Sequence, residues 1–167
     1  MESSEFASRF GVMQGRLLRQ TDAGYQAFPG ENWAEEFVIA QARGFGFIEW
    51  VVDSPSIRVN PILRESTEIR ELQSKTGVMV RSVCADFLMQ SWELGPNFLL
   101  DLFAALVEQM DDIGATHLVL PFVDNTSMKN SCVSKAEASE VMNRILDLDK
   151  SNPKTISVES DLEPKEL

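Results

Sequence analysis

One pattern repeats along the chain: an amphipathic helix, a glycine, a short apolar strand and then polar residues. Apolar residues at steps of three and four predict the helices, and short uninterrupted apolar runs predict the strands. The predicted helices span residues 33–43, 62–75, 98–113 and 134–149. The predicted strands span residues 10–14, 47–53, 78–86, 117–122 and 155–159.

The ends of the predicted helices carry recognisable signals. Residues that favour the left-handed conformation closing a helix follow each of the four, namely Gly44, Gly77, Gly114 and Asn152. Asn32 and Glu35 predict a capping pair at the start of the first helix. The third helix has one apolar face, which comprises Leu99, Leu102, Phe103, Leu106, Met110 and Ile113.

The order of the elements predicts a parallel α/β fold in a single domain, residues 1–167. Strands joined by helices are parallel, and apolar strands without strict alternation are typical of a sheet covered on both faces. A closed (β/α)₈ barrel of the TIM type needs about 250 residues. Five strand–helix units therefore predict an incomplete TIM-type barrel, with about five of eight units. The alternative is an open doubly wound sheet, but the first strand is not followed by a glycine-rich dinucleotide loop.

The composition limits the classes of molecule that we expect the chain to bind. The 15 Lys and Arg against 26 Asp and Glu give a net charge of −11, which repels nucleic-acid backbones and suits a cation or a small polar ligand. The same acidity also serves solubility. No apolar run is long enough to span a membrane, no secretory signal opens the chain, and Cys84 and Cys132 form no disulfide framework. We therefore expect a cytoplasmic protein.

Polar residues gather where each predicted strand ends, which is where parallel α/β folds place their chemistry. They are Gln14, Arg16, Glu49, Asp53, Cys84, Asp86, Asp124, Asn125, Glu159 and Asp161. If the sheet curls, these acids converge, and converging carboxylates bind divalent cations or transfer protons. Asp53, Asp124 and Asp161 fit helix caps equally well. Glu49 and Glu159 lie among apolar neighbours, so we expect both in buried strands with a functional role.

The remaining candidates favour structural roles. His117, the single histidine, begins its strand and should lie at the opposite end of the sheet from the acids. Cys84 is expected in the core, because free cysteine packs as a small hydrophobic residue. No histidine is available to act as its base, which argues against a thiol nucleophile. The three tryptophans, Trp33, Trp50 and Trp92, can line a sugar-binding face or pack internally.

Several segments, taken in order, resemble the sugar phosphate isomerase/epimerase proteins of the xylose isomerase-like TIM barrel superfamily. The resemblance covers the first five strand–helix units and nearly the whole chain. Its segments are Gly11-Val12-Met13-Gln14-Gly15-Arg16-Leu17, Gln26-Ala27-Phe28-Pro29, Trp33-Ala34-Glu35-Glu36-Phe37, Phe47-Ile48-Glu49-Trp50, Ser82-Val83-Cys84-Ala85-Asp86-Phe87, Val119-Leu120-Pro121-Phe122 and Ile156-Ser157-Val158-Glu159-Ser160-Asp161-Leu162.

The resemblance implies a divalent metal, Mn²⁺, Mg²⁺ or Co²⁺, held by residues of the last four strands of a full barrel. Glu159 matches the first ligand and also a catalytic proton carrier, while the other ligands would come from strands six to eight. The substrate-binding candidates are Gln14, Arg16, Glu49, Trp50 and Asp86. The predicted reaction is proton transfer beside a carbonyl through an enediolate, on a small sugar or sugar phosphate, in a complete barrel.

Two other functions stay open from the sequence. An incomplete barrel has open edges, so the chain can be a non-catalytic fragment that associates with itself or with a partner. A relative of the abasic-site endonucleases is the third possibility. It is opposed by the single histidine and by the charge of −11.

Overall fold

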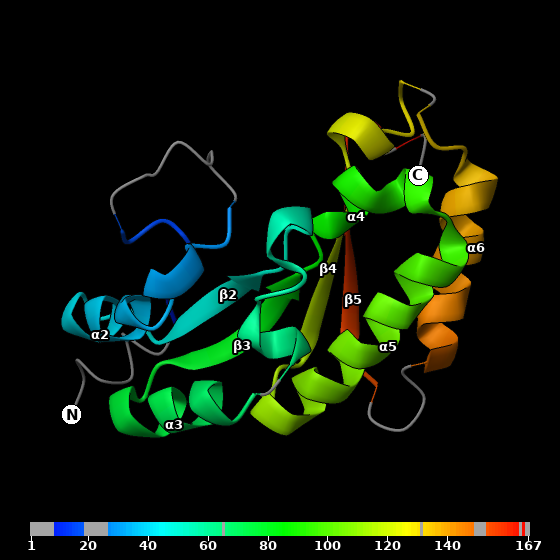
Figure 1. Ribbon diagram of the computed structural model, residues 1–167. Coiled ribbons are helices and arrows are strands. Elements are labelled where there is room, and N and C mark those ends of the chain that lie inside the picture. Colours follow the sequence, from blue (N-terminus) through cyan, green and yellow to red (C-terminus); the bar gives the residue numbers. More distant parts are fainter. Residues whose placement is uncertain are drawn as a thin grey trace.

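The fold is built on one sheet of five parallel strands in the order β1-β2-β3-β4-β5 (Figure 1). The computed structural model describes residues 9–18, 27–64, 66–130, 132–148, 153–163 and 165. The strands are β1 (Gly11–Met13), β2 (Phe47–Val51), β3 (Met79–Cys84), β4 (His117–Phe122) and β5 (Thr155–Ser160). All five predicted strands, and their parallel arrangement, are confirmed.

Helices and 3₁₀ turns connect successive strands. They are η1 (Gly30–Asn32), α2 (Glu35–Ala42), η2 (Ser54–Ser56), η3 (Pro61–Leu63), α3 (Thr67–Thr76), α4 (Phe87–Ser91), η4 (Trp92–Leu94), α5 (Pro96–Ile113), η5 (Asp124–Thr126) and α6 (Lys135–Leu148). The four long helices were predicted, although the second starts at Thr67 because a 3₁₀ turn occupies its expected first residues. No helix among the described ranges has the length and apolar character needed to cross a membrane.

The predicted helix ends are only partly correct. Gly44, Gly77 and Gly114 have φ angles of 79°, 72° and 75°, as the left-handed closing position requires. The predicted Asn32–Glu35 capping pair is wrong, because Asn32 lies in η1 and the N-cap of α2 is Ala34, which makes no side-chain capping bond. Asn152 lies outside the described residues.

The core lies between the helices and one face of the sheet. Ile48 and Trp50 of β2 and Leu118 of β4 are fully buried there, together with Phe103 and Leu106 of α5. Alternation along each strand places every second side chain on this face. Figure 1 shows α3, α5 and α6 following one another along the sheet, so the helices cover one side of it.

The last strand corrects one expectation. We expected β5 to be buried, but Thr155, Ser157, Val158 and Glu159 are exposed, Val158 by 40%. Within the described chain β5 pairs with β4 alone, through Pro121 opposite Glu159. An apolar strand is buried only where neighbours cover it, and nothing described here covers the free edge of β5 or the sheet face that carries Glu159.

Candidate functional site

The acids at the carboxyl ends of four strands share one electrostatic environment. Asp86, directly after β3, is only 3% exposed. Burial raises the pKa of its carboxyl to about 7, and the negative charges of Asp53, Glu159 and Asp124 raise it further in the same direction. These groups follow β2, end β5 and follow β4 respectively, so the sheet curls enough to bring them together.

Glu49 is held in place beside this group. Its partner on the neighbouring strand β3 is Ser82, and a register shift interrupts the pairing of β2 with β3 just before this pair. The Ser82 hydroxyl donates a hydrogen bond of 2.7 Å to Glu49 Oε2. Glu49 is half-buried, so one carboxylate oxygen is fixed by the protein while the side chain still borders the open face of the sheet.

Gln14, at the end of β1, presents a donor without a partner. The residue is 1% exposed; its backbone N–H donates to the Glu49 carbonyl at 2.9 Å, and its side-chain Oε1 accepts from the Val51 N–H at 3.0 Å. Its Nε2 is buried and finds no hydrogen-bond acceptor among the described residues. A buried donor without an acceptor costs free energy, so this amide is suited to donate a hydrogen bond to a ligand oxygen at the strand ends.

Two predicted substrate-binding residues are not brought into this group. Trp50 is fully buried on the helix side of β2, where its Nε1 donates to Asn60 Oδ1 at 2.9 Å and its ring lies 5.4 Å from that of Trp33. As placed, it cannot touch a ligand at the strand ends. Arg16 is exposed in the turn after β1, with Nη2 4.0 Å from Met13 Sδ.

The three tryptophans do not form a shared face. Trp33 is 8% exposed and packs edge-on against Trp50, so the internal-packing interpretation holds for both. Trp92 is half-buried and lies edge-on to Phe122 at 5.9 Å. A sugar-binding face made of all three side chains is therefore wrong.

Of the three aspartates offered as caps, Asp53 makes a capping bond and Asp124 does not, while the residues that Asp161 would cap lie partly outside the described residues. Asp53 caps η2 by accepting from the Ser56 N–H at 3.0 Å, and it also accepts from the Phe28 N–H at 3.0 Å. Asp124 makes no capping bond and has a φ of 49°, which is uncommon for a residue other than glycine. Asp161 accepts from the Ser127 hydroxyl at 2.7 Å, while its buried Oδ1 has no partner in the part of the chain described.

Comparison with solved structures identifies the type of fold. No protein-family model and no curated protein matches the chain. Among solved structures, the apo form of 3-keto-D-glucoside 4-epimerase from E. coli matches with a TM-score of 0.58 and 16% identity, over 89% of this chain and 54% of that one. A xylose isomerase-like TIM barrel protein from Mycobacterium smegmatis, solved in complex with magnesium, matches with a TM-score of 0.55 and 17% identity, over 89% and 53%.

The chain folds as part of a TIM-type (β/α) barrel. It spans about half the length of the solved structures it matches. The predicted fold class is therefore confirmed, and the open doubly wound alternative is not needed.

The described part of this partial barrel does not by itself fit a bound metal. Within it, no three His, Cys, Asp or Glu side chains are grouped so as to hold an ion. His117 is exposed at the amino end of β4, where its Nδ1 lies 2.9 Å from Thr116 Oγ1, so its predicted distance from the acids is confirmed. Glu159 alone is left as the candidate ligand.

The buried Cys84 thiol is not a candidate nucleophile. Cys84 is 3% exposed, and burial raises the pKa of its thiol well above the ordinary range, with Asp86, Glu49 and Glu159 adding to the effect. The thiolate is the nucleophilic form, so Cys84 stays inert, as its predicted core position implies.

A buried carboxylate that the sequence analysis missed fixes the loop after β1. Both oxygens of Glu36 on α2 accept from the Gly15 N–H at 2.9 Å, and Oε1 accepts from the Leu17 N–H at 3.1 Å. Burial raises the pKa of Glu36, although these backbone donors oppose the rise. Gly15 has a φ of 84°, and a Cβ there would lie 2.6 Å from the Ala27 carbonyl oxygen, so only glycine fits. The burial of Glu36 could have been predicted from its position next to Phe37, on the face of the helix that packs inward.

Proposed function

We propose that this chain forms part of an isomerase or epimerase that moves a proton beside a carbonyl in a small sugar or sugar phosphate. The observation that carries the proposal is buried Asp86 at one end of a parallel sheet, where the charges of Asp53, Glu159 and Asp124 add to burial in raising its pKa. The fold match to a 3-keto-D-glucoside epimerase and to a xylose isomerase-like protein supports the choice of substrate class. The activity of a complete barrel belongs to the same proposal.

Asp86 and Glu159 would divide the proton chemistry. A carboxyl whose pKa is raised to about 7 can hold or release a proton at neutral pH, which suits a general acid that protonates a carbonyl oxygen. Glu159, exposed on β5, would take the proton from the adjacent carbon. Return of a proton to the neighbouring carbon of the resulting enediolate, with the carbonyl re-formed at the first carbon, gives isomerisation. Return of a proton to the original carbon on its opposite face gives epimerisation.

Gln14 and Glu49 would bind and orient the sugar. The Gln14 amide is fixed by its bond from the Val51 N–H, so its Nε2 is available to donate to a hydroxyl or carbonyl oxygen. Glu49, held by Ser82, would accept from a sugar hydroxyl. Arg16, exposed in the turn after β1, would meet a phosphate group where the substrate extends that far.

A divalent metal, Mn²⁺, Mg²⁺ or Co²⁺, would polarise the carbonyl oxygen when bound. The residues described here supply Glu159 but no second and third ligand around it. The structural neighbour solved with magnesium makes a metal plausible in a complete barrel. No step of the proposed chemistry on this chain is routed through the ion.

Exchange of carbon-bound hydrogen tests this function directly. A complete barrel that contains this chain is incubated in D₂O with a panel of ketoses, 3-keto sugars and their phosphates, with and without Mn²⁺, and deuterium beside the carbonyl is followed by NMR. We expect incorporation that Glu159→Gln abolishes, that Asp86→Asn lowers, and that the exposed control Glu108→Gln leaves unchanged. Absence of incorporation for every sugar, or full exchange by Glu159→Gln, would contradict the proposal.

The exposed β5 favours a second candidate, association through its free edge. An edge strand with unpaired backbone groups is a template for another strand. Light scattering after size exclusion, over a wide range of concentration, measures this. A mass that grows with concentration supports association, and a constant monomer mass removes it.

A further inference from the structure

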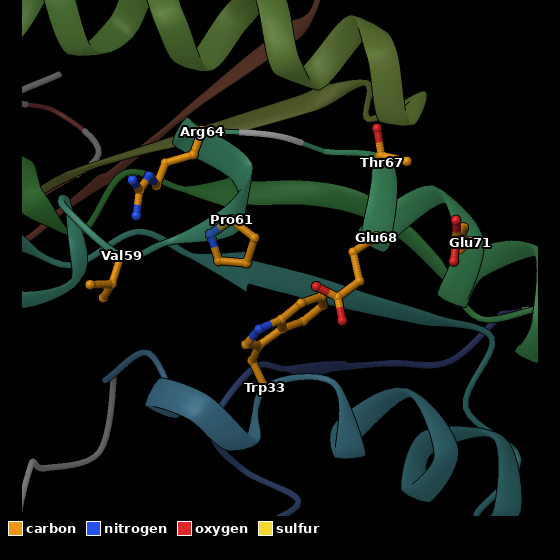
Figure 2. Close-up of a pocket in the computed structure, with 7 residues that line it drawn as sticks. All are labelled: Trp33, Val59, Pro61, Arg64, Thr67, Glu68 and Glu71. Carbon is orange, nitrogen blue, oxygen red and sulfur yellow. The ribbon is translucent and has the colours of Figure 1, made fainter.

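A second cavity lies away from the strand-end acids, on the helix-covered side of the sheet (Figure 2). Its volume is about 400 Å³. The residues that line it come from the end of η1, from η3 with the residues on either side of it, and from the first turns of α3: Trp33, Val59, Pro61, Arg64, Thr67, Glu68 and Glu71. None of the residues assigned to proton transfer or sugar binding borders it.

The wall of this cavity is fixed before any ligand arrives. Asn60, fully buried next to Pro61, donates to the Val51 carbonyl at 3.0 Å and accepts from Trp50 Nε1 at 2.9 Å. The Trp33 ring on the opposite wall packs edge-on against Trp50. Both walls are therefore tied to the same buried tryptophan, and the cavity is held open by the core.

Two of the charged side chains at the cavity are unpaired. Neither the Arg64 guanidinium nor the Glu68 carboxylate has a hydrogen-bond or ion-pair partner among the residues that the structure describes, and both residues are exposed. Glu71 has an exposed ion pair with Lys75 at 3.5 Å. Figure 2 shows the Glu68 carboxylate next to the Trp33 indole, and the Arg64 guanidinium on the far side of Pro61.

The surface between these charges is apolar. Pro61 lies between Arg64 and Glu68, with Val59 and Trp33 beside it (Figure 2). A complementary ligand therefore has a cation at one end, an anion at the other and an aliphatic spacer between them. An ammonium beside an indole ring gains further attraction from the ring electrons. A volume of about 400 Å³ falls within the range of small-molecule sites.

We propose that this cavity binds a small aliphatic zwitterion of the ω-amino acid class. Its ammonium lies beside Glu68 and against Trp33, its carboxylate meets Arg64, and its methylene groups cover Pro61. The site is separate from the proposed sugar chemistry, so either proposal can fail while the other stands.

Matched probes that share one carbon chain test the assignment. Calorimetry on the 167-residue chain uses 4-aminobutyrate and 6-aminohexanoate, with butylamine and butyrate as single-charge controls. We expect saturable binding of at least one zwitterion, with both single-charge probes weaker by about threefold or more, as partly exposed ion pairs predict. Saturable zwitterion binding that is no tighter than butylamine binding overturns the proposal in favour of a simple cation site.

Charge-removing variants assign each end of the ligand. Glu68→Gln should weaken the zwitterion and butylamine but not butyrate, whereas Arg64→Gln should weaken the zwitterion and butyrate but not butylamine. Glu108→Gln and Arg43→Gln, exposed on α5 and at the end of α2, are controls that should bind as the parent does. Thermal melts establish that every variant is folded. Zwitterion binding that is absent in the parent, or unchanged in both Glu68→Gln and Arg64→Gln, overturns the proposal.

Discussion

Strands β2 and β5 carry the same short pattern, apolar residues around a glutamate, yet their environments differ. In β2, Glu49 lies between two paired strands, is half-buried and accepts a bond from Ser82. In β5, Glu159 is exposed, and within the described chain only β4 pairs with its strand. The contrast shows that neighbours across the sheet, rather than the residues along a strand, decide whether such a carboxylate is buried and fixed.

The largest difference should come from truncating one apolar side chain on each strand. Trp50→Ala removes a fully buried indole and its bond to Asn60, and should lower the free energy of unfolding by about 3–5 kcal/mol. Val158→Ala, on a side chain 40% exposed, should cost less than about 1 kcal/mol. Urea denaturation measures both. Equal decreases in the free energy of unfolding for the two variants would show that β5 is covered in solution, and β2 and β5 would then not differ in burial.

A second effect concerns the acids that the two strands bring together. The folded chain holds the Asp86 proton up to about pH 7, whereas the unfolded chain releases it near the ordinary value of 3.8. The free energy of unfolding should therefore fall as the pH rises between these values, by an amount up to roughly 4 kcal/mol. Buried Glu36, whose pKa is also raised, adds to the same trend.

Asp86→Asn isolates the contribution of this group. The variant should match the parent near pH 4 and be more stable at pH 8, because the uncharged amide needs no ionisation in a buried site. Urea denaturation at both pH values gives the difference, with Glu108→Gln as a control that keeps the parent's slope. An unchanged slope in Asp86→Asn would mean that the pKa of Asp86 is not raised in the folded protein.

The smallest effects sharpen the comparison of the two glutamates. Ser82→Ala removes the bond to Glu49 and should cost about 0.5–1.5 kcal/mol. Glu159→Gln should change the free energy of unfolding by less than about 0.5 kcal/mol, because the side chain is exposed. Denaturant titration compares them. A large loss in Glu159→Gln would reveal a structural partner for this carboxylate.

The elements themselves could be predicted from the sequence. Apolar runs ending in polar residues marked all five strands, and apolar positions at three- and four-residue steps marked α5 to within a few residues. Helix α4 was missed, because its five residues, 87–91, continue the apolar run of β3 and are too few to show a helical period. The false Asn32–Glu35 cap has a related cause, since a 3₁₀ turn displaced the start of α2.

The site was harder to predict. The meeting of the strand-end acids followed from the parallel topology, but the orientation of each side chain did not. The burial of Trp50 on the helix side could have been predicted from the alternation of side chains along β2. Because Glu49 faces the open side of the sheet, its neighbours in the strand face the helices. The exposure of Glu159 had no local signal, since it depends on strands that the described chain does not place beside β5.

The bonds from Gly15 and Leu17 to Glu36 bear on how readily a ligand can be received next to Arg16. Two loop amide protons are withheld from solvent by a buried carboxylate, so hydrogen exchange at these positions should be slow for a loop. The backbone that leads into Arg16 is then ordered in the free protein. Much of the entropy that binding would otherwise remove from this segment is already lost on folding, which favours rapid and selective capture of a ligand there.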